Sequence, residues 1–339
     1  MNNQEADSPL FSRTPVVQQS TPPVVVVGLP RSGSSFLAHV LSTLDGWYVF
    51  DDLYLYEKVQ MLNVNGTLQP EQLHQLVNFL GWTVRARVKF EKSFLKPQCT
   101  WEDVDQMVEA VLETFKDRPV YWHQLLEEWL MRLALHHGCW RWGYKTPKDF
   151  LHMDMLVDLF PGIRFIFIRR DPRKMMASKK YVHKQDGDPR EYHPIAYALY
   201  WKMAYEKIQR FIDTGRASVY AVKFEELVVD PNGVAQQLAA FLETTVSGSV
   251  PIKGKNTSFG SGKRQDITET EKWICEHLVG ESMEKAGYTR GEVSPKLHDL
   301  GDLLGTSIRF AQHQMWRVLT RPDKRVAVVS YVRGLLGKK

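Results

Sequence analysis

VVVVGLPRSGSSFL, residues 24–37, is the stretch of this sequence that says most about its fold. Four valines predict a short buried strand, the small residues after them predict a turn, and the apolar run that follows predicts a helix. A glycine-rich turn between a strand and a helix N-terminus binds phosphate through backbone N–H groups and the helix dipole. Gly28 and Gly33 have the spacing of the ATP-binding loop G-x-x-x-x-G-K-[ST]. Ser34 occupies the lysine position, however, and the cation inside the loop is Arg31, so we expect a phosphate other than the β- and γ-phosphates of a nucleoside triphosphate.

The composition is that of a globular protein, with 339 residues of which 43% are hydrophobic. This length suffices for one large α/β domain or two smaller ones. No apolar run approaches the roughly 18 residues that a membrane-spanning helix needs. Residues 1–21 are polar and rich in proline, serine and glutamine, which predicts a disordered leader. Three scattered cysteines are too few for a disulfide framework or a zinc site and favour a reducing cytoplasm: Cys99, Cys139 and Cys275.

A basic C-terminal segment accounts for the net charge of +5. Residues 309–339 hold eight lysines and arginines against one acid, Asp323, so the rest of the chain is slightly acidic. The folded body lacks basic residues interleaved with aromatic ones, so we expect no nucleic-acid partner. Apolar and basic residues alternate over 315–336, which favours a terminal helix packed on the body. Peripheral contact of this tail with an anionic membrane surface or a protein partner is the alternative.

Four segments have the pattern of strands: residues 24–27, 140–144, 164–168 and 218–222. Helical patterns separate them, so the simplest assembly is an α/β fold with a central, mostly parallel sheet and right-handed helical crossovers. Ligands of such sheets bind beyond the carboxyl ends of the strands. Lys145 and Arg170 follow strands directly, and we expect them to converge there with the opening loop.

Residues 53–138 contain no convincing strand and predict a helical insertion. Helical patterns cover residues 69–79, 100–115 and 122–136, and Thr100 is a good N-cap for the second of them. Such an insertion serves either as a lid that shapes a binding pocket or as a purely structural crossover. The sequence leaves both interpretations open.

A second phosphate-type signal lies in RFIFIRRDPR, residues 164–173. A buried strand delivers Arg170 to the edge of the sheet, and Asp171 with Pro172 then begins a helix as N-cap and first residue. Ser178 lies nearly two turns into that helix, close enough to share one anion with the arginine. The alternative is an arginine at a strand end that pairs with a nearby carboxylate.

Five segments in order along the chain resemble the PAPS-dependent sulfotransferases, in their bacterial and tyrosyl-protein variety. They resemble, in turn, the family's 5′-phosphosulfate loop, its central lysine element, its 3′-phosphate motif, its YEDL…DP segment and its late nucleotide-binding loop. The five are GLPRSGSS at 28–35, WGYKTP at 142–147, IRRDPR with the following serine at 168–178, VKFEELVVDP at 222–231 and NTSF at 256–259. The resemblance implies a P-loop-type three-layer α/β fold with a helical insertion over the acceptor site. It also implies a sulfotransferase domain over residues 22–290, after which the apolar and basic pattern predicts a basic helical extension over residues 291–339.

The donor implied by the resemblance is 3′-phosphoadenosine 5′-phosphosulfate (PAPS), with adenosine 3′,5′-bisphosphate (PAP) as product and no metal. Arg31 and Lys145 are implied to stabilise the charge on the sulfuryl oxygens and the departing phosphate. The residues implied to bind the donor are Arg31, Ser32, Gly33, Ser34 and Ser35 at the 5′-phosphate, Arg170 and Ser178 at the 3′-phosphate, and Ser258, Phe259 and Lys263 in the late loop.

The resemblance also points to a catalytic base. Family members that act on phenols and steroids place a histidine two residues after the central lysine, where this chain has Pro147. The tyrosyl-protein type instead uses an acid about twenty residues past the loop arginine, to accept the acceptor's proton. Ungapped counting places it at Asp52, with Asp51 as the neighbouring alternative.

Two positions depart from the family pattern. Phe224 replaces the tyrosine of the YEDL element, and Val182 stands where the tyrosyl-protein type has a donor-binding arginine. Lys179, Lys180 or Lys263 could supply the missing charge.

Sulfuryl transfer to a hydroxyl or amine of a small molecule is therefore the favoured function. The absence of a secretion signal disfavours secreted protein tyrosines and extracellular glycans as acceptors. A kinase-like transferase that uses ATP is one alternative, and the absence of the loop lysine disfavours it. A nucleotide-binding protein without catalysis is another, and the presence of Arg31, Lys145 and Asp52 disfavours it.

Overall fold

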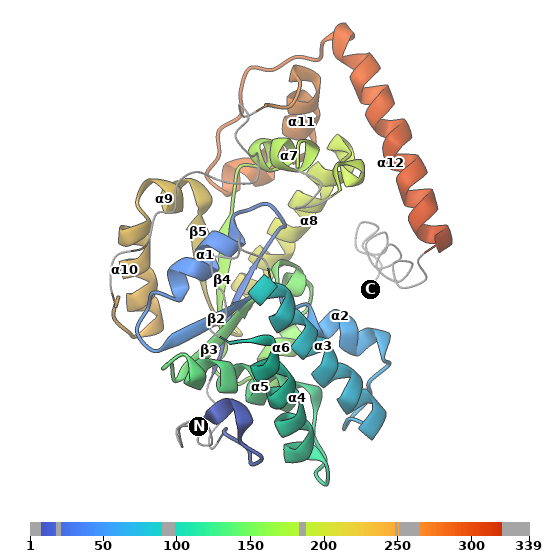
Figure 1. Ribbon diagram of the computed structural model, residues 1–339. Coiled ribbons are helices and arrows are strands. Elements are labelled where there is room, and N and C mark those ends of the chain that lie inside the picture. Colours follow the sequence, from blue (N-terminus) through green and yellow to red (C-terminus); the bar gives the residue numbers. More distant parts are fainter. Residues whose placement is uncertain are drawn as a thin grey trace. The chain divides into compact units, whose positions relative to one another are not determined.

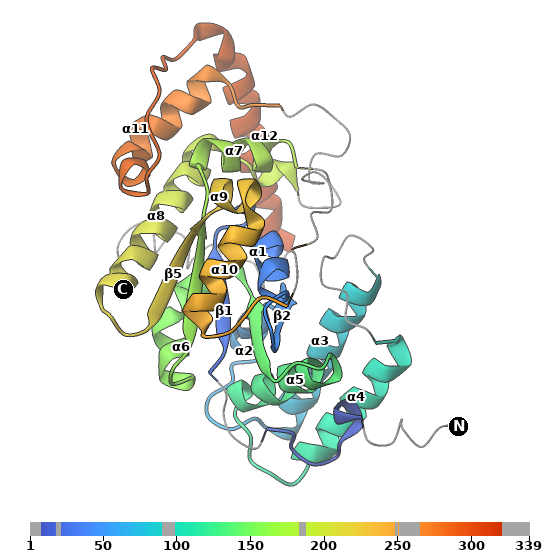
Figure 2. The ribbon, with the colours of Figure 1, turned by 90° about the vertical axis from the view of Figure 1, so that its left-hand side faces the viewer.

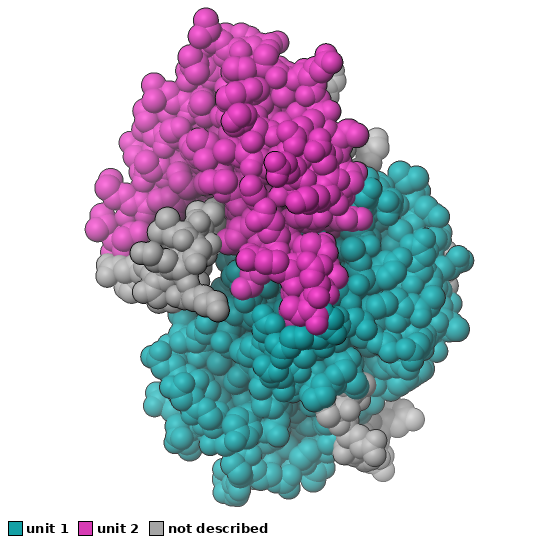
Figure 3. All heavy atoms as spheres, turned by 180° about the vertical axis from the view of Figure 1, so that it is seen from behind, with its two compact units in different colours: residues 1–27, 33–168, 215–250 teal, residues 28–32, 169–214, 251–339 magenta. Residues whose placement is uncertain are grey.

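The computed structural model describes residues 8–17, 22–89, 99–182, 188–247, 250 and 265–320. The chain divides into two compact units (Figure 3). Unit 1 comprises residues 1–27, 33–168 and 215–250, and unit 2 comprises residues 28–32, 169–214 and 251–339.

A five-stranded parallel sheet forms the centre of unit 1, with the strand order β2-β3-β1-β4-β5 (Figure 1). The strands are β1 (Val24–Gly28), β2 (Trp47–Asp51), β3 (Arg141–Lys145), β4 (Arg164–Arg169) and β5 (Ser218–Lys223). Strands β1, β3, β4 and β5 confirm the four segments predicted from the sequence. Strands β2 and β3 lie on one side of β1, and strands β4 and β5 lie on the other. The strand order therefore reverses at β1, and ligands of open parallel sheets bind beside such a reversal. The loop that follows β1 begins at this point.

Strand β2 is a fifth strand that the sequence patterns did not predict. Its five residues, WYVFD, are all buried, and a short apolar run of this kind cannot be told from a buried helical segment by periodicity. Pairing with β3 decides its conformation. The register sets Phe50 opposite Tyr144 and Asp51 opposite Lys145.

Helices cover both faces of the sheet within unit 1 (Figure 2). On one face, α1 (Ser34–Leu41), α9 (Phe224–Val229) and α10 (Pro231–Leu242) pack on side chains that alternate along β1, β2, β4 and β5. Alternation places the other buried side chains of these strands on the opposite face. There α5 (Trp122–His136) packs on β2 and β3. A 3₁₀ turn (Pro147–Leu151) and α6 (Met153–Leu159) lead from β3 to β4.

The predicted helical character of residues 53–138 is confirmed for the parts that the structure describes, 53–89 and 99–138. They contain α2 (Leu55–Met61), α3 (Pro70–Lys89), α4 (Trp101–Phe115) and α5. Thr100 caps α4 as expected, because its side chain accepts from the backbone N–H of Asp103 while the Asp103 carboxylate accepts from the backbone N–H of Thr100.

Residues 8–17 differ from the prediction of a disordered leader. They contain a 3₁₀ turn (Pro9–Phe11) that packs on α4 and α5. The fully buried guanidinium of Arg132 donates to the backbone oxygens of Leu10 at 3.2 Å and Ser12 at 2.6 Å. Glu128 accepts from the backbone N–H of Val16 at 2.9 Å. Polar composition did not reveal this segment because Arg132 and Glu128 bind its backbone and, of residues 8–17, Leu10 alone is buried.

Unit 2 is helical in its described part. It contains α7 (Pro172–Lys180), α8 (Pro194–Asp213), α11 (Glu269–Lys285), α12 (Leu300–Thr320) and the 3₁₀ turns Pro189–Glu191 and Leu297–Asp299. Helix α8 packs on both α7 and α11. Of the helices whose residues are described, none is long and apolar enough to cross a membrane.

Candidate active site

The loop between β1 and α1 has the backbone of an anion-binding turn. Arg31 has φ = 76° and Gly33, the N-cap of α1, has φ = 96°. Left-handed residues within a tight loop let successive N–H groups point to one side, toward an anion. The N-cap makes no side-chain hydrogen bond to the first turn of α1, which leaves the N–H groups at Ser34 and Ser35 available. Non-glycine residues rarely adopt the conformation of Arg31, and such strain is typical of functional loops.

Gly33 is required by its surroundings as well as by its dihedral angle. A Cβ atom built on Gly33 would lie 2.2 Å from Cδ2 of Phe224, so the Phe224 ring occupies the space beside this glycine. Phe224 is the residue that replaces the family's tyrosine. In this chain the aromatic ring packs against the loop without a hydroxyl.

Within unit 2, the predicted 3′-phosphate residues lie together with the loop arginine. Arg31 donates from Nε to Oγ of Ser178 at 3.2 Å, and Arg170 donates to the backbone oxygen of Arg31 at 2.9 Å. Arg170 and Ser178 are buried. Ser32, in the same loop, is buried too, and among the described residues its hydroxyl has no hydrogen-bond partner. Two guanidinium groups and two hydroxyls therefore gather in unit 2, a set of groups suited to phosphate.

Two aromatic residues of α8 hold this cluster, and sequence reasoning missed both. The Tyr197 hydroxyl donates to the backbone oxygen of Pro30 at 2.8 Å. The Trp201 indole donates to the backbone oxygen of Arg170 at 3.1 Å. Burial raises the pKa of Tyr197, so it remains a hydrogen-bond donor. The sequence from about Pro194 to Thr214 predicts a long helix, which α8 confirms, but nothing in it showed which aromatic hydroxyl or indole would reach the loop.

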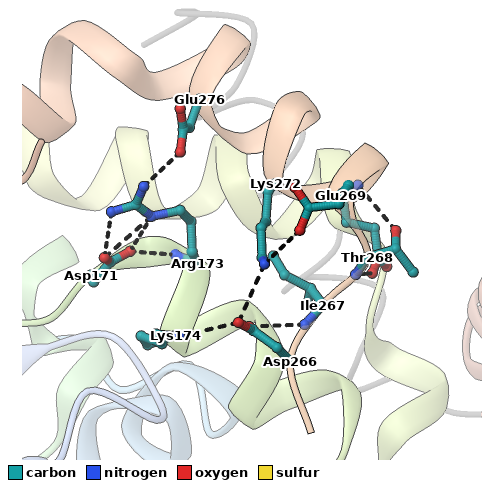
Figure 4. A network of polar contacts seen from close by, with 10 residues as sticks. Asp171, Arg173, Lys174, Asp266, Ile267, Thr268, Glu269, Lys272 and Glu276 are labelled. Carbon is teal, nitrogen blue, oxygen red and sulfur yellow. Dashed lines mark hydrogen bonds and ion pairs between the residues drawn. The ribbon is translucent and has the colours of Figure 1, made fainter. Parts of the chain in front are cut away.

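A network of ion pairs positions α7, the helix that carries Ser178 (Figure 4). Asp171 caps α7 and accepts from the guanidinium of Arg173, which also pairs with Glu276 of α11 at 2.6 Å. Farther along, Lys174 pairs at 3.2 Å with Asp266, which Lys272 of α11 also contacts at 3.4 Å. Helix α7 is thus tied to α11 and to the chain that follows residues 251–264. Ser258, Phe259 and Lys263 lie in that segment, outside the described residues.

In unit 1, the central lysine meets both candidate bases. Lys145 at the end of β3 pairs with Asp51 at 2.7 Å and with Asp52, to which it also donates a hydrogen bond. Parallel pairing of β2 with β3 produces this arrangement, since Asp51 lies opposite Lys145 and the backbone N–H of Asp52 donates to the backbone oxygen of Lys145 at 2.9 Å. The side chains of Asp51 and Lys145 are 8% and 3% exposed, whereas that of Asp52 is 25% exposed. Asp52 is therefore the more accessible of the two carboxylates.

Two residues from the helical segment after β2 surround Asp52, and sequence reasoning missed these as well. Arg87, near the end of α3, lies 3.3 Å from the second carboxylate oxygen of Asp52. The Tyr54 side chain also hydrogen-bonds to Asp52. Burial raises the pKa of Asp52, but the charges of Lys145 and Arg87 and these hydrogen bonds outweigh it and hold the pKa below its usual value. Asp52 is ionised at neutral pH, with φ = 56° turning it out of the strand.

A further buried carboxyl, Asp149, follows Lys145 in the turn after β3. Burial raises its pKa to about 7, against the opposing effect of a hydrogen bond with the Tyr144 hydroxyl, and the charge of Glu57 raises it further. Burial is the largest effect on this pKa, and the causes found among the described residues include no cation. Asp149 was not singled out in the sequence.

Two of the three lysines that could have replaced the missing donor-binding arginine form ion pairs elsewhere, and the third, Lys263, lies outside the described residues. Lys179 pairs with Glu191 at 2.8 Å, and Lys180 pairs with Glu271 at 2.9 Å. Val182 is buried. Among the residues that the structure describes, no group of three or more histidine, cysteine or carboxylate side chains could hold a metal ion.

The chain belongs to the sulfotransferase family, whose model matches residues 22–248. Among solved structures it is similar to the sulfotransferase domain of the olefin synthase from Synechococcus PCC 7002, with 18% identity, 88% of this chain and 98% of that chain covered, and a TM-score of 0.45. It is also similar to sulfotransferase STF9 from Mycobacterium avium, with 12% identity, 86% and 81% coverage, and a TM-score of 0.40. A sulfotransferase from Alicyclobacillus acidocaldarius follows, with 14% identity, 77% and 97% coverage, and a TM-score of 0.39. No curated protein sequence matches the chain.

Proposed function

We propose that this sulfotransferase moves a sulfuryl group from PAPS to a hydroxyl or amine of a small molecule. The observation that carries the proposal is the cluster of unit 2, in which Arg170 and Arg31 lie with Ser178. A phosphate on the ribose distinguishes PAPS from other adenylates, and buried guanidinium and hydroxyl groups are the donors that such a phosphate needs. The buried hydroxyl of Ser32, which has no hydrogen-bond partner among the described residues, supports an anionic ligand at the same loop.

In this reaction the protein positions the donor and the acceptor and neutralises negative charge. PAPS supplies a sulfuryl group whose bond to the 5′-phosphate oxygen breaks as the acceptor oxygen or nitrogen bonds to sulfur. Asp52 accepts the proton that the acceptor loses. Lys145 and Arg31 stabilise the negative charge on the sulfuryl and phosphate oxygens. This assignment rests on the resemblance of their motifs and on the strong effect of preorganised cations on charge that develops during a reaction. Lysine and arginine can supply that charge without a metal.

Calorimetric titration with PAP, adenosine 5′-monophosphate and ATP tests the donor. We expect PAP to bind about a hundredfold more tightly than the monophosphate, since the 3′-phosphate adds charge-assisted hydrogen bonds. Ser178→Ala should weaken PAP about tenfold and leave the monophosphate unchanged, while Ser282→Ala, at another buried serine of unit 2, should change neither. Binding of ATP without binding of PAP would instead support the kinase-like alternative.

Asp52→Asn tests the base. It should lower kcat by about a hundredfold or more with PAP affinity unchanged, because a positioned base contributes on this scale. A full rate in Asp52→Asn together with a loss in Asp51→Asn would move the assignment to Asp51. If PAP binds and no acceptor is ever sulfated, the chain is a nucleotide-binding protein without catalysis.

Acceptor identity is accessible to a direct assay. Isotopically labelled PAPS is incubated with a panel of phenols, alcohols, amines, sugars and tyrosine peptides, and products are read by mass spectrometry. Label in a small molecule supports the proposal. If label appears only in tyrosine peptides, the acceptor is a protein and the proposal of a small-molecule acceptor is wrong.

A further inference from the structure

The guanidinium of Arg87 in unit 1 is only partly used by the groups around it. Its Nη2 atom lies 3.3 Å from a carboxylate oxygen of Asp52, and Arg87 has no other ion pair among the described residues. Its Nε atom is buried and has no hydrogen-bond partner in the described part of the chain. A guanidinium has five N–H donors in a planar fork, and a buried donor without a partner costs free energy. Arg87 therefore has hydrogen-bonding capacity left for a further acceptor.

Arg85, two residues earlier on α3, shows how an arginine of this helix is held when its role is to join helices. It donates a hydrogen bond to Asp105 of α4 and forms an ion pair with it. The side chains of Arg85 and Arg87 are almost equally exposed, at 23% and 22%. Arg85 thus links α3 to α4, whereas Arg87 contacts the carboxylate that is proposed as the base.

The charges around Asp52 balance only while it is ionised. The ion pairs there join two cations, Lys145 and Arg87, to the carboxylates of Asp51 and Asp52. In the proposed reaction the acceptor's proton goes to Asp52 as the acceptor oxygen or nitrogen bonds to sulfur and PAP departs. Protonation leaves Arg87 beside a neutral carboxyl group, and a largely buried cation without an anion is unfavourable. A second negative charge at Arg87 would compensate it at this step.

The negative charges of the donor are assigned to other cations. Arg31 and Lys145 are assigned to the sulfuryl group and the departing phosphate, and Arg170 to the 3′-phosphate. Arg87 belongs instead to α3, within the helical segment 53–138 that the family resemblance puts over the acceptor site. The acceptor is therefore the partner that remains for Arg87.

We propose that Arg87 selects acceptors that carry a negatively charged group, such as a carboxylate, close to the hydroxyl or amine that is sulfated. The inference rests on the proposed function and names the class of acceptor within it. The anionic group accepts two hydrogen bonds from the guanidinium fork, a geometry that suits planar oxyanions. Arg87 then shares its charge between Asp52 and the acceptor, so Asp52 becomes a stronger base once the acceptor is in place.

Matched acids and amides test the proposal with labelled PAPS. The probes are para-hydroxybenzoate, para-hydroxyphenylacetate and para-hydroxyphenylpropionate, each beside its primary amide, at about pH 8, where carboxylates are ionised. The three acids place the charge at different distances from the hydroxyl. We expect at least one acid to be sulfated with kcat/KM about thirtyfold above that of its amide, since charge-assisted hydrogen bonds contribute on this scale.

Variants of α3 locate the preference. Arg87→Gln should reduce the ratio of kcat/KM for acid over amide to about one, and Arg87→Lys, which keeps the charge without the fork, should retain part of it. Arg85→Gln is the matched control and should keep the full ratio, because Arg85 pairs with Asp105. PAP affinity should be the same in all variants, which shows that each has folded.

The outcomes separate this inference from the proposed function. Equal use of acid and amide, or sulfation of other acceptors but of no acid, would overturn the inference and leave the proposed function intact. A loss in Arg87→Gln that is the same for acid and amide would overturn it in favour of a contact between Arg87 and the sulfuryl group. Absence of PAP binding or of any sulfation would overturn the proposed function, and the inference with it.

Discussion

At the residue scale, the site of unit 1 depends on how two cations share two carboxylates. Lys145 contacts both Asp51 and Asp52, and Arg87 contacts Asp52 alone. An acid held below its usual pKa is ionised under working conditions but is a weak base. Asp52 becomes a stronger base whenever one of these cations turns to another negative charge.

Arg87→Gln is expected to raise the pKa of Asp52, because it removes a positive charge 3.3 Å from the carboxylate. The proposed mechanism uses the ionised form of Asp52 as the base, so the acidic limb of the kcat profile should move up by as much as about one pH unit. A series of rate measurements against pH checks this. Arg85→Gln, on the same helix but paired with the exposed Asp105, is the control and should leave the limb in place. An unmoved limb in Arg87→Gln would contradict the role given to Arg87.

Asp149 makes stability depend on pH near neutrality. Its pKa rises on folding to about 7, so the folded state binds the proton more tightly than the unfolded state. The stabilisation is present in full below the unfolded pKa and is lost as pH rises through about 7, by at most about 4 kcal/mol. Urea unfolding at a series of pH values measures it. Asp149→Asn, which keeps the shape without the charge, should flatten the dependence between about pH 4 and 7; an unchanged slope would count against this assignment.

At the scale of elements, the turn between β1 and α1 accepts only glycine at position 33. Gly33→Ala combines a left-handed φ with a Cβ atom 2.2 Å from the Phe224 ring. We expect a loss of roughly 2–4 kcal/mol in unfolding free energy and weaker PAP binding. Gly215→Ala, where φ is 64° and no atom lies within 4 Å of the added Cβ, isolates the backbone cost of about 1 kcal/mol. Equal losses at the two positions would show that Phe224 does not constrain the loop.

The pair Arg132 and Glu128 attaches residues 8–17 to α5. Its atoms lie 2.7 Å apart, with both side chains buried. Arg132→Met should lower the unfolding free energy by about 3–5 kcal/mol, because it leaves the Glu128 carboxylate buried without its cation. Trypsin should also cleave faster after Arg13. The double variant with Glu128→Gln should recover part of the stability; no recovery would mean that packing, not charge, dominates.

At the scale of the whole molecule, a ligand that binds the folded chain and not the unfolded chain raises its stability. PAP at a hundred times its Kd should add about 2.7 kcal/mol to the stability of the folded chain. Thermal unfolding with and without PAP measures this as a rise in Tm. Adenosine 5′-monophosphate at the same concentration is the control, and an equal rise would argue against recognition of the 3′-phosphate.

Much of the fold could be predicted from the sequence, because the patterns that indicate it involve residues close together in the chain. Four strands, the loop after β1 and the capped start of α4 rest on residues that lie next to one another in the chain. Strand β2 did not follow, since its five buried residues become a strand only through pairing with β3. The docked segment 8–17 did not follow either, since it is held by one buried side chain, Leu10, and by its backbone atoms, which bind an ion pair distant in sequence.

The sequence by itself determined the class of chemistry: a phosphate-binding turn that has arginine in place of the ATP-loop lysine, and the family motifs that accompany it. Only the tertiary structure decided which side chains meet. It brought Arg31 to Ser178 and Arg87 to Asp52, and supplied Tyr197 and Trp201 as supports. The reason is physical, since a motif needs only neighbours in sequence, whereas an ion pair and a buried pKa each depend on what folding brings within a few ångströms.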